Sequence, residues 1–203
     1  MKPVKPFSEA CERNREPILA VLREAFAEPA RVRTVLEIGS GTGQHAVYFA
    51  EHLPDVAWQC SDLPEHHPGI NAWIDDAPCA NVLRPLALDV REAVWPVAAV
   101  DAVYTANTLH IMDSASVAAT FRGIARVVRG GGVVVAYGPF NYQGAFTSAS
   151  NAQFDAILRA RGVGSALRDF EAVDALARGA GLTLVCDVPM PANNRTLVWR
   201  KTA

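Results

Sequence analysis

The stretch from Thr34 to His45 constrains the fold of this chain more than any other part of its sequence. Its first half, TVLEI, is short, apolar and partly β-branched, which suits a strand buried on both faces. Its second half places a glycine at every second position from Gly39 to Gly43. Glycine has no Cβ, so its backbone can adopt a positive φ and a ligand can approach it closely. Because the next run, QHAVYFA, predicts a helix, the stretch predicts a strand, a nucleotide-type binding turn and a helix.

The spacing of these glycines distinguishes between nucleotide ligands. A dinucleotide fingerprint reads G-x-G-x-x-G, whereas here the third glycine arrives one residue early and Glu37 stands two places before the first. This form resembles motif I of class I S-adenosylmethionine (SAM)-dependent methyltransferases. SAM has no pyrophosphate, so the turn has to admit only its carboxypropyl arm and ribose, and a strand-end carboxylate can face its cationic end. The residues expected along this arm are Glu37, Gly39, Ser40, Gly41 and Gly43; the alternative is an ordinary turn without a ligand.

Length and composition fit one domain that spans residues 1–203. Half of the residues are hydrophobic, which is enough for a substantial single core. The chain has 19 Lys and Arg against 21 Asp and Glu and no basic run, so we expect neither a large nucleic-acid surface nor a membrane surface. Residues 1–14 contain no apolar core of a signal peptide, and the four cysteines form no C-x-x-C pair. We therefore expect a cytoplasmic protein with reduced thiols that acts on a small molecule.

The N-terminal segment, residues 1–28, is expected to be helical. The run PILAVLREAF begins with Pro17, which suits a first helical turn, and it places Ile18, Leu22 and Phe26 on one face. The polar residues 12–15 before it could form a solvated cap or could close over the cofactor.

Acidic residues follow the second and third predicted strands. Asp62 lies about 20 residues beyond the glycine turn, where dinucleotide and SAM sites both place an acid. Its carboxylate, with Leu63 beside it, can accept from both hydroxyls of a ribose, or it can simply cap the next turn. The third strand, within residues 81–90, ends in Asp89 and Val90. This ending resembles the methyltransferase position where a carboxylate accepts from the adenine amino group and the next residue covers the ring; the alternative for Asp89 is a helix cap.

The fourth predicted strand, residues 100–106, leads directly into Asn107 and His110. Sheets of α/β proteins bind ligands in crevices outside the carboxyl ends of parallel strands. Asn107 is therefore a candidate for contact with the cofactor and His110 for a catalytic base, although a lone histidine is more often structural. The segment lacks the Asn/Asp-Pro-Pro-aromatic run of amino-methylating DNA enzymes, which argues against that substrate class.

Two further segments carry local predictions. Residues 64–68 hold adjacent histidines between prolines but lack further ligands at metal-binding spacing, so we expect an exposed loop and no metal site. Asp113 or Ser114 is expected to cap a helix that the glycines at 130–132 stop.

The fifth predicted strand, residues 133–137, opens into a long insertion, residues 139–168, that we expect on the substrate side. Phe140 and Tyr142 of this insertion are candidates for the acceptor pocket, and Tyr142 is a second candidate for proton transfer. A short helix is expected near residues 154–158.

The chain closes with a helix that Asp169 starts and two strands, residues 182–188 and 196–201. The connection between the strands is short, which makes them antiparallel. It contains Asn193 and Asn194, which could orient an acceptor or could only hold the turn. The predicted fold is α/β, a three-layer Rossmann-like class I methyltransferase fold with a seven-stranded sheet of order 3-2-1-4-5-7-6 and strand 7 antiparallel.

Several sequence features together carry a narrower resemblance. They are ERN at 12–14, PIL at 17–19, SGTGQH at 40–45, LDV at 88–90, Asn107 with His110, YGPF at 137–140, SN at 150–151, FD at 154–155, RD at 168–169 and MPANN at 190–194. With these features the chain resembles the methyltransferase-like protein 26 family over nearly its whole length. The resemblance implies a class I methyltransferase fold and SAM binding, with Arg13 and Asn14 over the cofactor, and no particular reaction. One departure is RGVGSAL at 161–167, where family members tend to carry Asp/Asn-Pro-x-Trp-Gly.

These features predict a SAM-dependent methyltransferase that transfers a methyl group to an oxygen or nitrogen atom of a small molecule and releases S-adenosylhomocysteine. Such a transfer is an in-line displacement, in which the protein mainly aligns the reactants and a base is needed only for a protonated acceptor. The alternative is a non-catalytic SAM- or adenosyl-binding protein that acts through a partner. A third hypothesis, an NAD(P)-dependent oxidoreductase, is disfavoured by the glycine spacing and by the reversed last strand.

Overall fold

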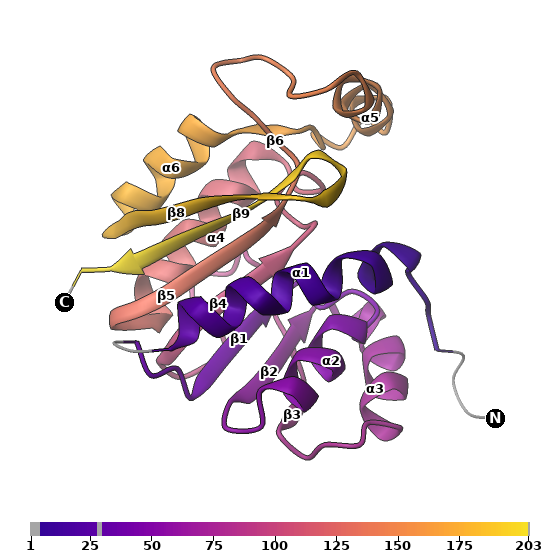
Figure 1. Ribbon diagram of the computed structural model, residues 1–203, viewed down its shortest axis with the longest axis vertical. Helices are drawn as coiled ribbons and strands as arrows, with labels where there is room; N and C mark the ends of the chain where they lie inside the picture. The colour runs from indigo at the N-terminus through magenta and orange to yellow at the C-terminus, as the bar shows by residue number, and fades with distance from the viewer. Residues whose placement is uncertain (1–4, 28–29, 203) are drawn as a thin grey trace.

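A seven-stranded sheet runs through the centre of the molecule (Figure 1). The computed structural model describes residues 5–27 and 30–202, so residues 1–4, 28, 29 and 203 of the expected domain lie outside this description. The strands of the sheet are β1 (Thr34–Ile38), β2 (Ala57–Asp62), β3 (Val82–Ala87), β4 (Val100–Ala106), β5 (Val128–Gly138), β8 (Leu182–Met190) and β9 (Asn194–Lys201). Their spatial order is β3-β2-β1-β4-β5-β9-β8, and β9 is antiparallel to both neighbours. This confirms the predicted order, in which β8 and β9 are strands six and seven.

Helices cover both faces of the sheet and give the molecule three layers (Figure 1). They are α1 (Glu9–Phe26), α2 (Gln44–His52), α3 (His67–Asp75), α4 (Ser114–Val127), α5 (Ala149–Ala160) and α6 (Phe170–Gly179). Helices α1, α2 and α3 contribute buried residues to the apolar cluster on one face, and α4 and α6 contribute to the cluster on the other. Helix α5 lies near the carboxyl end of β5 (Figure 1).

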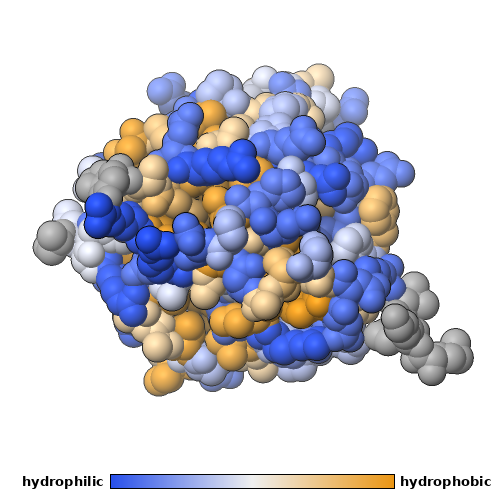
Figure 2. Space-filling model, turned by 60° about the horizontal axis from the view of Figure 1, so that its bottom comes forward, coloured by the Kyte–Doolittle hydropathy of each residue, from blue (hydrophilic) through white to orange (hydrophobic). Residues whose placement is uncertain are grey.

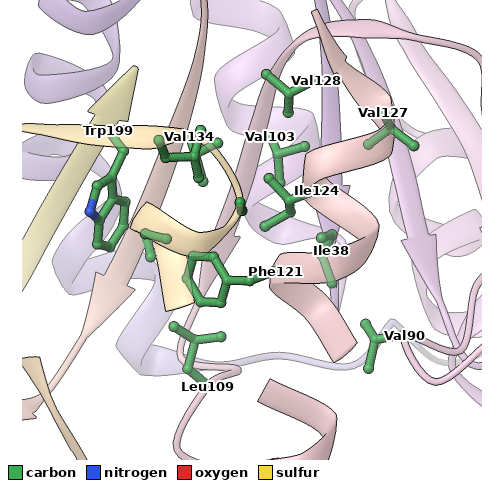
Figure 3. Close-up of a cluster of buried hydrophobic side chains, with 14 of the residues drawn as sticks. Ile38, Val90, Val103, Leu109, Phe121, Ile124, Val127, Val128, Val134 and Trp199 are labelled. Atoms are coloured by element: carbon green, nitrogen blue, oxygen red, sulfur yellow. The ribbon is translucent and has the colours of Figure 1, made fainter. Parts of the chain in front are cut away.

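The central strands are buried on both faces, as their continuous apolar runs predict. Figure 3 shows Phe121 and Ile124 of α4 beside Val134 of β5 in one cluster. The neighbours Val133 and Val135 belong to the cluster on the opposite face, because successive side chains of a strand point to opposite sides.

Helix α1 begins at Glu9, well before the predicted start at Pro17, which therefore lies inside the helix. A proline inside a helix removes a backbone N–H and one hydrogen bond. Buried residues on both sides of Pro17, among them Asn14, Ile18 and Leu22, hold the two halves of α1 against the rest of the protein. The prediction that residues 12–15 precede the helix is therefore wrong.

The predicted loop at residues 64–68 is also helical. It forms a short 3-10 helix, η1 (Pro64–His66), and the first turn of α3. Pro64 and Pro68 both lie in first turns, where the missing N–H has no intrahelical partner in any case.

Asp113 caps α4 as predicted, and its carboxylate accepts a hydrogen bond from the backbone N–H of Ser116. The helix ends at Val127, however, and the glycines at 130–132 lie within β5. The glycines therefore do not stop the helix.

The insertion at 139–168 contains α5, which is longer than predicted, and the two-residue strand β6 (Phe140–Asn141). β6 pairs in parallel with β7 (Arg168–Asp169) to form a small second sheet. Strands of two residues have no periodicity of their own, so the sequence did not predict them.

Within the described part of the chain, no helix combines the length and the apolar character that a membrane span needs. On the face that Figure 2 shows, hydrophilic and apolar residues are intermingled. The same residues contain no group of three His, Cys, Asp or Glu side chains arranged to hold a metal ion.

Candidate cofactor and acceptor site

Two adjoining cavities lie at the carboxyl ends of the first four strands. The glycine-loop cavity, of about 310 Å³, is lined by Ser8, Cys11, Glu37, Gly39, Ser40, Gly41, Thr42, His45, Asp62, Ala106, Asn107, Thr108 and Ile111. The β3-side cavity, of about 260 Å³, is lined by Ile38, Gly39, Asp62, Leu63, His66, Leu88, Asp89, Val90, Arg91, Thr108, Ile111, Met112 and Ser116. The two share Gly39, Asp62, Thr108 and Ile111, so together they form one elongated site. A larger cavity of about 660 Å³ at the opposite ends of these strands contains none of the predicted site residues.

The glycine turn adopts the backbone that its sequence predicts. Gly39, Gly41 and Gly43 all have positive φ, at 72°, 57° and 90°. A Cβ on Gly39 would lie 2.9 Å from the Thr108 side chain, so this glycine lets the two loops approach each other. A Cβ on Gly43 would lie 3.0 Å from the backbone of Ile70, and Gly43 lines neither cavity. Gly43 therefore serves the packing of α2 against α3 and does not lie in the cavities as predicted.

Asp62 ends β2 and lies at the junction of the two cavities. Its Oδ2 accepts from the backbone N–H of Gly41 at 2.7 Å, and its Oδ1 accepts from the backbone N–H of Leu63 at 2.8 Å. These two bonds fix the carboxylate, and each carboxylate oxygen has a further lone pair for a ligand.

Glu37 forms a buried acidic wall of the glycine-loop cavity. Glu37 is 2% exposed, and the indole N–H of Trp58 donates to Glu37 Oε2 at 3.1 Å. Burial raises the pKa of Glu37 to about 7, while the hydrogen bond from Trp58 opposes this shift. A bound cationic group would favour the ionised form, because an opposite charge compensates for lost hydration.

The raised pKa of Glu37 predicts a pH-dependent stability. The folded protein holds this proton up to about pH 7, whereas the unfolded chain loses it near 4.5, so rising pH destabilises the fold between these values. We expect Glu37→Gln to raise the free energy of unfolding by about 2 kcal/mol at pH 8 and by little at pH 4.5. Urea denaturation at both pH values measures the difference. Glu51→Gln, an exposed glutamate of α2, is the control, and an equal gain for Glu37→Gln at both pH values would contradict the argument.

Asp89 and Val90 lie in the β3-side cavity, as predicted for residues near an adenine ring. Asp89 is held by Arg91, whose Nε lies 2.9 and 3.0 Å from the two carboxylate oxygens. This contact lowers the pKa of Asp89. A ligand amino group at Asp89 would therefore share the carboxylate with Arg91.

Asn14 lies behind the glycine-loop cavity and not over it. Its Oδ1 is 2.7 Å from Nε2 of His45, a cavity residue that the sequence did not single out. Because an amide oxygen only accepts, Nε2 carries the proton, and Nδ1 accepts from the hydroxyl of Tyr104 at 3.3 Å. Burial lowers the pKa of His45 to about 4, so the ring is neutral. Gln44 Oε1 also accepts from the N–H of Ser8 at 2.6 Å, so α1 is held to the start of α2 at two points.

This arrangement predicts a structural effect of Asn14. In Asn14→Ala the buried N–H of His45 loses its side-chain acceptor and keeps only the backbone of Cys11, so we expect a loss of about 1 kcal/mol in the free energy of unfolding. Arg13→Ala is the control, because the Arg13 side chain is 70% exposed and we expect a change below about 0.5 kcal/mol. Urea denaturation tests both. An Asn14→Ala protein of unchanged stability would overturn the structural role.

Asn107 and His110 follow β4, but only Asn107 lines a cavity. His110 is 5% exposed, and its ring lies edge-on to that of Phe154 with 5.4 Å between the centroids. Among residues 5–27 and 30–202, no group hydrogen-bonds to the ring nitrogens of His110. Burial, and then the charges of Arg168 and Arg161, lower its pKa to about 4. The ring is therefore neutral at pH 7, and burial and the two positive charges oppose its protonation.

The other residues predicted for the acceptor pocket have structural partners. Phe140 is 2% exposed and belongs to the apolar core. The Tyr142 hydroxyl donates to Asp187 Oδ2 at 2.6 Å, and burial together with Asp187 raises the pKa of Tyr142. Asn193 Nδ2 lies 3.4 Å from Ser150 Oγ, and Asn194 Nδ2 donates to the carbonyl of Pro191. The contact with Asp187 and the raised pKa keep the proton on Tyr142, which disfavours the predicted proton transfer. Asn194 holds the turn between β8 and β9, and Asn193 ties this turn to α5.

The lining residues that the sequence did not single out as site residues are Ser8, Cys11, Ile38, Thr42, His45, His66, Leu88, Arg91, Ala106, Thr108, Ile111, Met112 and Ser116. Ser8 and Cys11 reach the cavity because α1 starts early, Ser116 lies in the first turn of α4, and the others lie within three residues of predicted positions. The ERN motif at residues 12–14 was the one sequence signal that the start of α1 lies near this site.

The fold is the Rossmann-like α/β fold of class I methyltransferases, with two adjoining cavities at the strand ends. The chain belongs to the family described as "Protein of unknown function (DUF938)", whose model matches residues 5–201.

Solved structures of methyltransferases share this fold. An O-methyltransferase family protein from Burkholderia thailandensis is 20% identical with a TM-score of 0.82, over 96% of this chain and 58% of that chain. An O-methyltransferase family 2 protein from Planctomyces limnophilus, in complex with apigenin, is 17% identical with a TM-score of 0.83, over 95% and 58%. An O-methyltransferase from neocarzinostatin biosynthesis, with SAM and 2-hydroxy-5-methyl naphthoic acid, is 19% identical with a TM-score of 0.74, over 96% and 54%. This chain thus spans little more than half the length of these structures.

Proposed function

We propose that this protein is a SAM-dependent methyltransferase that acts on an oxygen or nitrogen atom of a small molecule. The observation that carries the proposal is the position of Asp62, a fixed carboxylate between two adjoining cavities. A nucleoside linked to an amino-acid arm needs such a pair of cavities with an acceptor for ribose hydroxyls between them.

We assign the parts of SAM to the two cavities from the chemistry of the residues that line them. The glycine-loop cavity would hold the amino-acid arm, with Glu37 near its ammonium group. The β3-side cavity would hold the adenine, with Leu88 and Val90 against the ring and Asp89 toward its amino group. SAM supplies a methyl group on a cationic sulfur. The work of the protein would be to align the acceptor and exclude water, with His110 taking a proton from an acceptor that carries one.

Oxygen is the favoured acceptor atom. Each of the three compared structures is an O-methyltransferase, and two of them hold hydroxylated aromatic molecules. A neutral His110 beside two arginines suits an acceptor that becomes an anion when it loses its proton, as a hydroxyl does. We also propose that the protein is related to the methyltransferase-like protein 26 family. We propose a cytoplasmic location as well.

Calorimetric titration of the full chain with SAM, S-adenosylhomocysteine and NADH tests the cofactor. We expect SAM and S-adenosylhomocysteine to bind and NADH not to bind; the reverse would overturn the proposal in favour of an oxidoreductase. Release of S-adenosylhomocysteine during incubation with a panel of phenols, aromatic acids and amines then tests the reaction.

The second candidate function is SAM or adenosyl binding without catalysis. It is favoured by one observation, that His110 lies outside the lining of both cavities. Binding of SAM without turnover of any member of the panel would support this candidate.

A further inference from the structure

The segment 164–168 lies against the loop that carries His110. Four successive carbonyl oxygens of the loop, those of residues 109–112, each accept a hydrogen bond from this segment. Arg168 Nε donates to Leu109 O at 3.2 Å, Ala166 N to His110 O at 3.0 Å, Ser165 Oγ to Ile111 O at 2.5 Å, and an Arg168 terminal nitrogen to Met112 O. The segment thus holds the loop along its whole length.

The loop needs such support because it leaves the sheet after β4 and walls both cavities. Thr108 and Ile111 line both, and Met112 lines the β3-side cavity. Within the loop, the N–H groups of Ile111 and Met112 both donate to the carbonyl of Thr108, which makes a single turn. A single turn has little stability of its own, so contacts from outside decide its position.

The segment 164–168 is itself anchored. Asp155 of α5 is 3% exposed, and its two carboxylate oxygens accept from the N–H of Leu167 at 2.8 Å and from Arg159 Nε at 2.5 Å. Arg168 also donates to Gly164 O at 2.8 Å and to Ser114 Oγ at 3.0 Å. The guanidinium therefore ties the insertion, the loop and the start of α4 together.

We propose that Arg168 is a positioning residue, which fixes the loop 107–112 and with it the imidazole of His110 and the shared wall of the two cavities. The proposal rests on the proposed methyl transfer, in which His110 takes the proton of the acceptor.

Arg168 affects His110 in two separable ways, by holding the loop and by its charge. Burial is the main cause of the lowered pKa of His110, and the charges of Arg168 and Arg161 add to it. Arg168 and Arg161 are the charged groups that lower the pKa of His110, and the ring packs edge-on against Phe154. Arg168→Lys keeps the charge and loses the planar set of donors, whereas Arg161→Gln loses a charge and leaves the segment 164–168 intact.

Hydrogen exchange of the ligand-free chain and NMR titration of the His110 ring test the proposal without a substrate. In Arg168→Lys we expect the amides of residues 109–113 to exchange about tenfold faster or more, and the pKa of His110 to rise toward its ordinary value as water reaches the ring. In Arg161→Gln we expect a small rise of the pKa and unchanged exchange. The resonance of His110 is assigned with His110→Gln.

Unchanged exchange at 109–113 in Arg168→Lys, or equal changes in Arg168→Lys and Arg161→Gln, would overturn the positioning role. Neither measurement depends on SAM, so a failure of the proposed function, seen as absence of SAM binding, is distinguishable from a failure of this inference. If Arg168→Lys does not fold, Arg168→Gln keeps a planar amide donor but cannot supply all the bonds of the guanidinium, and unchanged exchange at 109–113 in that variant would also overturn the proposal.

Discussion

Asp62→Ala is expected to weaken SAM binding by roughly ten- to a hundredfold. The variant loses a charged acceptor that is held at the junction of the two cavities, and one charge-assisted hydrogen-bonding group contributes about 1.5 to 3 kcal/mol. Calorimetric titration of the folded variant with SAM measures the dissociation constant.

Asp62 also holds the glycine turn, so the test needs variants that separate the two roles. Asp62→Asn keeps an oxygen for the N–H of Gly41 and removes the charge, and we expect SAM affinity between those of the wild type and Asp62→Ala. Asp75→Ala is the control, because Asp75 is an exposed residue of α3 that pairs with Arg84 outside both cavities. A SAM dissociation constant in folded Asp62→Ala equal to that of the wild type would remove the ribose assignment.

The sheet order could be predicted from sequence because its signals are local. Buried strands such as β1 and β4 are short apolar runs, and each is followed at once by the polar residues of its carboxyl end. The short connection before β9 fixed its direction. Glu37, Asp62 and Asp89 could be predicted to lie at one edge of the sheet in the same way, because the carboxyl ends of parallel strands lie at the same edge.

The acceptor side could not be predicted in the same way, because partners distant in sequence decide the role of each side chain. Tyr142 bonds to Asp187, which lies 45 residues away, and this bond disfavours proton transfer by Tyr142. Asn14 could be placed near the site by its motif, but its contact with His45, 31 residues away, makes it a support of the site. The start of α1 was missed because Pro17 has the same sequence signal in a first turn as in the interior of a packed helix.

His110→Ala is expected to lower turnover by about a hundredfold and to leave SAM affinity nearly unchanged. The ring lies outside the lining of both cavities, so its loss does not remove a contact with the cofactor. A positioned base contributes about a hundredfold or more to the rate when the acceptor must lose a proton. Turnover is measured as release of S-adenosylhomocysteine with an acceptor from the panel, and SAM affinity by calorimetry. His52→Ala, at the far end of α2, is the matched histidine control.

The pH dependence of turnover gives a second, independent result for His110. A base acts in its neutral form, and the pKa of His110 is lowered to about 4, so the wild type should keep its activity well below pH 6.5 and lose it only as the pH approaches 4. An unperturbed histidine would instead lose activity through pH 6.5. In His110→Ala most of the turnover should be lost, and the remaining turnover should no longer fall as the pH approaches 4. Full activity in His110→Ala would exclude His110 as the base, and the residues that hold the cofactor would then have to account for the rate by alignment alone.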